Sequence, residues 1–120
     1  MNPDPPSTYM ARSEFLVFAA VCDLREATTA EVQARLADHY AHNLASEIVA
    51  VLLLRVMDKG WLYNVASNGN VEPRFTPTAA YTEALATHFR RFLREYAMDR
   101  PEAFVVLRAE LRAAADDTAA

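Results

Sequence analysis

The sequence predicts a mainly α-helical, α+β fold in which three helices precede a two-stranded hairpin and two more helices follow it. The apolar content is 52% and only two of the 120 residues are glycine, which is typical of an ordered, helix-rich chain. Gly60 stands directly after an apolar helical stretch, where glycine commonly ends a helix. Asn68-Gly69 is a strong short-range signal for a tight hairpin turn.

The first three predicted helices have recognisable ends. Ser13 is suited to cap a helix over about residues 14–24, whose apolar residues recur at helical spacing. Thr28 and Glu31 form a capping-box pattern that opens a second helix over about 29–40. The third helix covers about 45–59.

The segment after Gly60 predicts a wing. Residues 61–65 alternate as a strand does, and a return strand is expected over about 71–75, with Pro73 marking an edge or a bulge. Thr76 and Pro77 are suited to the N-cap and first turn of a fourth helix that reaches about residue 98. A hairpin that follows three helices in this way predicts a winged helix-turn-helix with a two-stranded wing.

The C-terminal third predicts helices that form a dimer. Apolar residues of the fourth helix are spaced by 4, 4, 3 and 4 positions, which resembles a heptad seam, and a fifth helix opens around Pro101. We expect a flexible N-terminal arm at 1–9, a head at 10–77, a dimerisation arm at 78–115 and a disordered tail at 116–120. The predicted interface consists of Tyr81, Leu85, Phe89, Phe92, Tyr96, Phe104, Leu107 and Leu111.

Charge and composition limit the function classes. The N-terminus lacks the features of a signal peptide and no apolar run is long enough to cross a membrane, so a cytoplasmic protein is expected. No Gly-rich phosphate loop, H-E-x-x-H or G-x-S-x-G motif occurs, so we expect neither an enzyme nor a cofactor. A zinc site at Asp38, His39 and His42 would need at least one further ligand from elsewhere in the sequence, and Cys22 is the only cysteine, so no metal site is expected.

The acidic balance of the chain opposes strong nonspecific binding to nucleic acid. The net charge is −4, and residues 1–80 carry six basic and nine acidic side chains, a net charge of −3. DNA-binding domains are usually basic because phosphate neutralisation supplies much of their affinity. A local basic patch can still outweigh the sum.

Three segments carry a likeness to a known family. Thr28 to Val32 is similar to a T-x-x-E-V helix start, Leu53 to Leu62 to the signature L-x-R-L-x-x-K-G-W-L, and Arg74 to Pro77 to a wing exit x-Y-x-P. With the order of elements, they resemble the BlaI/MecI/CopY family of bacterial penicillinase-repressor-like regulators. PadR-like and MarR-like regulators share the R-L-x-x-K-G ending and remain alternatives. The resemblance implies a homodimeric repressor whose heads contact the two halves of a palindromic operator in double-stranded DNA.

Candidate DNA-contacting residues lie on the third helix and the wing. Arg55 and Lys59 are suited to phosphate contact, with solvated surface as the alternative. Ser46 and Glu47 are suited to base edges, although helix capping is the favoured interpretation. The full set is Ser46, Glu47, Ala50, Val51, Arg55, Lys59, Asn68, Asn70 and Arg74.

The third helix also supports an alternative function. Ile48 to Leu54 is apolar around the whole helix, and such a helix is normally buried on all sides. Either one apolar face is open and meets thymine methyl groups, or protein covers it. In the second case the chain is a winged-helix protein–protein interaction module that has lost operator reading.

Overall fold

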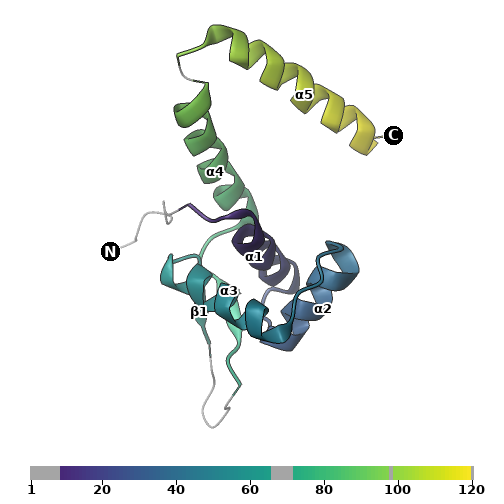
Figure 1. Ribbon diagram of the computed structural model, residues 1–120, viewed down its shortest axis with the longest axis vertical. Helices are drawn as coiled ribbons and strands as arrows, with labels where there is room; N and C mark the ends of the chain where they lie inside the picture. Colours follow the sequence, from purple (N-terminus) through teal and green to yellow (C-terminus); the bar gives the residue numbers. More distant parts are fainter. Residues whose placement is uncertain (1–8, 66–71, 98, 120) are drawn as a thin grey trace. The chain divides into compact units, whose positions relative to one another are not determined.

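The winged helix-turn-helix prediction is confirmed. The computed structural model describes residues 9–65, 72–97 and 99–119 (Figure 1). The chain divides into two compact units, Met1–Ala86 and Thr87–Ala120. In chain order, the elements of the described residues are α1 (Arg12–Leu24), α2 (Thr29–His39), α3 (Ser46–Asp58), β1 (Leu62–Asn64), β2 (Phe75–Pro77), α4 (Tyr81–Tyr96) and α5 (Pro101–Ala119).

The first unit is built around one apolar core to which α1, α2, α3 and the wing strands all contribute. Trp61 is completely buried and its ring meets Phe18 of α1 edge-to-face, with centroids 5.7 Å apart. Trp61 thus joins the start of the wing to α1. Gly60, with φ 90°, lies one residue beyond the α3 C-cap, so the predicted glycine stop is confirmed.

The helix caps are confirmed for α2 and corrected for α1. At α2, the Glu31 N–H donates to Thr28 Oγ1 at 3.3 Å and the Thr28 N–H donates to Glu31 Oε1 at 2.9 Å. At α1 the N-cap is Ala11, not Ser13, so the helix begins earlier than expected. Alanine has no capping side chain; instead Glu14 reaches back and accepts the Ala11 N–H at 2.7 Å.

The return strand of the wing lies further along the chain than expected. β2 covers 75–77 rather than 71–75, so Pro73 precedes it and α4 begins at Tyr81, not at Thr76-Pro77. The strands are antiparallel, with Leu62 opposite Pro77 and Asn64 opposite Phe75. Phe75 is fixed as a strand residue because it exchanges two backbone hydrogen bonds with Ala27, at 2.8 and 2.9 Å. The expected Asn68-Gly69 turn lies outside the described residues.

The boundaries of the arm also differ from those expected. The first unit extends past residue 77 to Ala86, because Ala84 is part of its core and the Tyr81 ring lies 5.7 Å from that of Phe15. At the other end α5 continues to Ala119, through most of the segment expected to be disordered. The run of alanines at 113–115 explains the continuation, because alanine has the highest helix propensity.

Candidate functional site

The outer face of α3 is open. Val49, Leu53 and Val56 are completely buried in the core. On the opposite side the exposed fractions are 50% for Ile48, 45% for Val51 and 52% for Leu54. Of the two alternatives for this helix, the first unit therefore shows the one with an open face: Val49, Leu53 and Val56 pack in the core, and the remaining apolar residues form a separate surface.

The two ends of this face differ in charge. Ser46 is the first residue of α3 and does not cap it, since Ala45 is the N-cap and no side chain makes the capping bond. Glu47 is exposed in the first turn, where a carboxylate complements the helix dipole. Arg55 is exposed in the last turn, whereas Ala50 is half-buried at the margin. The face is thus acidic at its start, apolar in the middle and basic near its end.

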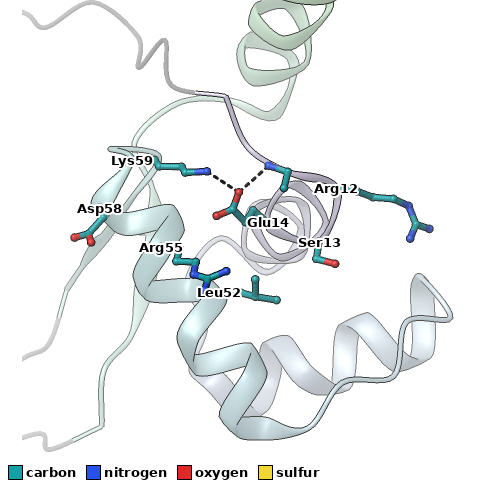
Figure 2. Close-up of a pocket in the computed structure, with 8 residues that line it drawn as sticks. Arg12, Ser13, Glu14, Leu52, Arg55, Asp58 and Lys59 are labelled. Carbon is teal, nitrogen blue, oxygen red and sulfur yellow. Dashed lines mark hydrogen bonds and ion pairs between the residues drawn. The ribbon is translucent and has the colours of Figure 1, made fainter.

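A cleft of about 840 Å³ lies between the start of α1 and the C-terminal half of α3 (Figure 2). Figure 2 shows Lys59 and Glu14 pointing toward each other across it, while Arg12 and Asp58 point outward. The cleft is lined by Ala11, Arg12, Ser13, Glu14, Leu52, Arg55, Asp58 and Lys59.

Lys59 is held inside the first unit by an ion pair. Its Nζ donates to Glu14 Oε1 at 2.7 Å and to the backbone carbonyl oxygen of Tyr9 at 3.0 Å. Burial by itself would raise the pKa of Glu14. The hydrogen bonds from Lys59 and the Ala11 N–H, together with the charges of Lys59 and Arg55, outweigh burial and hold that pKa below its ordinary value. Lys59 therefore neutralises a buried carboxylate and fixes the chain entering α1 against the end of α3.

Arg74 is likewise engaged within the unit. Its Nε donates to Glu26 Oε1 at 2.9 Å, and its guanidinium lies 3.7 Å from Glu31. Its backbone N–H donates to Asn64 Oδ1 at 3.3 Å. This cation therefore joins the base of the wing to the start of α2. The predicted wing residues Asn68 and Asn70 lie outside the described residues.

Three arginines of the first unit, Arg12, Arg25 and Arg55, are exposed and form no salt bridge within the described part of the chain. Arg12 and Arg55 line the same cleft from two different helices. Sequence reasoning identified Arg55 but not Arg12. Nothing local distinguishes Arg12 from other surface arginines, and only the packing of α1 against α3 brings it to this cleft.

The remaining side chains that could carry chemistry are Cys22 and the groups able to bind a metal ion. Cys22 is half-buried; burial, with the neighbouring Asp23 carboxylate, raises the pKa of its thiol to about 11. A thiol with that pKa stays protonated at neutral pH and is a poor nucleophile. Among residues 9–65, 72–97 and 99–119, no group of three or more His, Cys, Asp or Glu side chains is placed to hold a metal ion. In the same ranges, no helix has the length and apolar character to cross a bilayer.

The predicted interface residues of the arm are largely open to solvent. Leu107 is half-buried. The exposed residues are Tyr81, Leu85, Phe89, Phe92, Tyr96, Phe104 and Leu111. Within the second unit, a groove of about 280 Å³ is lined by Phe89, Leu93, Phe104, Leu107, Arg108 and Leu111.

Several solved structures share this fold. RosR of H. salinarum is 14% identical, with a TM-score of 0.54 over 88% of this chain and 96% of that one. A MarR family protein from Bacillus stearothermophilus is 16% identical, with a TM-score of 0.51 over 94% of this chain and 78% of that one. F93 from STIV, a winged-helix DNA-binding protein, is 8% identical, with a TM-score of 0.54 over 76% of this chain and 98% of that one.

The family is established by the sequence itself. No curated protein matches the chain. The family model described as "Penicillinase repressor" matches residues 10–120, which include all the described helices and both wing strands. That family consists of transcriptional repressors and not of enzymes. This chain therefore belongs to the penicillinase repressor family, and its fold is that of a winged-helix regulator.

Proposed function

We propose that the protein is a homodimeric transcriptional repressor that binds a palindromic operator in double-stranded DNA. The observation that carries the proposal is the open outer face of α3, the second helix of the helix-turn-helix, in a chain of a repressor family. In this motif the second helix enters the major groove and its N-terminal residues meet the base edges. The corresponding residues are Ser46, Glu47, Ala50 and Val51.

Phosphate contacts come chiefly from Arg55, with Arg12 as an addition. Both guanidiniums are exposed and lack a salt bridge among the described residues, so binding a phosphate breaks no ion pair. Lys59 and Arg74 have a smaller share, because each already neutralises carboxylates of its own unit. Few contacts and an acidic head together make nonspecific binding weak.

The arm supplies the dimer interface. The apolar stripe of α4 and the groove beside α5 leave large side chains in solvent, and burying one of them is worth about 1.5–3 kcal/mol. A second copy of the arm offers the same stripe, as a two-fold interface requires. A dimer would also present two α3 faces to one duplex, matching an operator with two-fold symmetry.

The test is a selection of random duplexes by the purified protein at low and at moderate salt. The proposal predicts enrichment of a palindrome whose half-sites lie about one helical turn, 34–36 Å, apart. The matched control is the triple variant Ile48→Asp/Val51→Asp/Leu54→Asp, which changes only exposed positions on α3 and should enrich no sequence while keeping its thermal unfolding.

One observation favours a second function, binding to another protein through α3. The exposed apolar residues of α3 lie in an acidic part of the chain, since residues 1–80 carry a net charge of −3, and this suits an apolar protein partner better than a polyanion. If the wild-type protein retains no duplex even at low salt, the repressor proposal fails and this alternative replaces it.

A further inference from the structure

The exposed face of α3 combines features that restrict which bases it can recognise. Ile48, Val51 and Leu54 are each about half exposed and recur every three residues, so their side chains adjoin along one side of the helix. Val51 lies at the middle of this row. Its helical neighbours on the same side are Glu47, one turn before it, and Arg55, one turn after it.

The hydrogen-bonding groups that commonly read purines are missing from the first nine residues of α3. Arginine and lysine pair with guanine, and asparagine and glutamine pair with adenine. Residues 46–54 contain none of these four types, and their polar side chains are those of Ser46 and Glu47. Glutamate accepts from the cytosine amino group, and serine pairs with several bases.

One group on the major-groove edges matches the apolar row. The C5-methyl group of thymine is the apolar feature of those edges. An α-helix about 10–12 Å wide fits a major groove about 12 Å wide. Arg55, at the end of the same face, and Arg12, across the adjoining cleft, supply positive charge beside the apolar row, as contact with phosphates flanking the groove requires.

We infer that α3 selects its operator by apolar contact between Ile48, Val51 and Leu54 and the methyl groups of thymines, so that thymine methyls rather than purine hydrogen bonds determine the half-site. The inference rests on the proposed operator binding and adds the base chemistry to it. Glu47 contributes a preference for cytosine next to the contacted thymines.

Replacing thymine by deoxyuridine tests the inference, because it removes the methyl group and keeps the Watson–Crick pairing. In the selected palindrome, each thymine is replaced in turn, together with its symmetry mate, and the affinity is measured by fluorescence anisotropy. A lost methyl contact weakens binding about fourfold, hence about sixteenfold for the symmetric pair. Thymines in the flanking duplex serve as the control and should tolerate deoxyuridine.

The protein side of the test uses Val51→Ala. Because Val51 is exposed, the truncation should leave thermal unfolding unchanged. At the base pair that Val51 contacts, the variant should bind the thymine and the deoxyuridine duplex with nearly equal affinity. Ile48→Ala and Leu54→Ala should each remove the discrimination at a different base pair. Val105→Ala is the matched control, since Val105 is an exposed valine of α5, and it should keep the full sixteenfold discrimination.

The outcomes separate this inference from the function on which it rests. A palindrome that binds tightly and tolerates deoxyuridine at every position overturns methyl reading and leaves operator binding standing. Discrimination that survives all three alanine variants also overturns it, because the methyl groups would then be read elsewhere. If no duplex binds, both proposals fall and a protein partner for α3 takes their place.

Discussion

The two units use their apolar side chains in opposite ways. In the first, Phe18, Leu36 and Trp61 are buried completely. In the second, Phe92 and Tyr96 are 44% and 65% exposed. The difference separates two kinds of apolar surface: the head buries its own in a core, whereas the arm leaves its own exposed, as the proposed dimer requires. A substitution in the head should therefore act at any protein concentration, and one in the arm should act through the dimer.

The largest expected effect comes from the head. Trp61→Ala should lower the free energy of unfolding by about 3–5 kcal/mol, because truncating a buried aromatic side chain loses its burial and leaves a cavity. Urea unfolding followed by circular dichroism measures it. The loss should be the same at low and high protein concentration. An unchanged unfolding midpoint would contradict the placement of Trp61 in the core.

The next effect lies in the arm. Phe92→Asp should dissociate the proposed dimer, because each copy would lose about 1.5–3 kcal/mol of burial and gain a charge at the proposed interface. Sedimentation velocity at micromolar concentration should show a monomer that still has the tryptophan fluorescence of a folded head. Val105→Asp is the control, since Val105 is exposed but lies off the proposed interface, and it should remain a dimer. If the wild-type chain sediments as a folded monomer, the proposed dimer is wrong, and so is the contrast drawn between the two units.

Two glutamates of the head cap a helix in the same way but differ in burial, so their substitutions should differ in cost. Glu14 and Glu31 both accept the N-cap N–H of their helix, yet Glu14 is buried with Lys59 whereas Glu31 is half exposed near Arg74. Glu14→Gln should cost about 1.5–3 kcal/mol at pH 7, as expected for a hydrogen bond to a charged group. Glu31→Gln should cost about 0.2–1 kcal/mol, as expected for an exposed pair.

The Glu14–Lys59 ion pair also predicts how the free energy of unfolding depends on pH. The pKa of Glu14 is lowered in the folded state, so the stabilisation from its ionised form is complete above its ordinary value near 4.5 and is lost as the pH falls through the lowered value. Unfolding free energies measured from pH 7 down to pH 3 should therefore fall less steeply in Glu14→Gln than in the wild type. If the free energy of unfolding falls equally steeply with pH in both proteins, the ion pair between Lys59 and Glu14 does not stabilise the fold.

Local signals predicted the fold well, and tertiary contacts account for what they missed. Thr28, Glu31 and Gly60 act within a few residues, and their predicted roles are confirmed. The α1 cap was misplaced because Ala11 has no capping side chain and its bond comes from Glu14. The β2 strand was misplaced because its position is set by pairing with Ala27, 48 residues earlier in the sequence.

The candidate site was predictable only in outline. The sequence places Val51 and Arg55 on the third helix, but which side of its apolar stretch, Ile48 to Leu54, stays open depends on what α1, α2 and the wing cover. Lys59 was indistinguishable from Arg55 as a phosphate ligand until the fold brought Glu14 to it. Arg12 carried no local signal and joins the site through the cleft alone.

The most direct test of the proposed DNA interface is the salt dependence of operator binding in wild type and Arg55→Ala. The two principal phosphate contacts per head, from Arg12 and Arg55, should contribute about −3.6 to the slope of log affinity against log salt for the proposed dimer. Arg55→Ala should reduce this contribution to about −1.8 and weaken all sequences alike. Arg112→Ala, which removes the same charge from an exposed position of α5, should leave the slope at the wild-type value. A slope that is identical in all three proteins would contradict the account, because Arg55 would then make no contact with the operator.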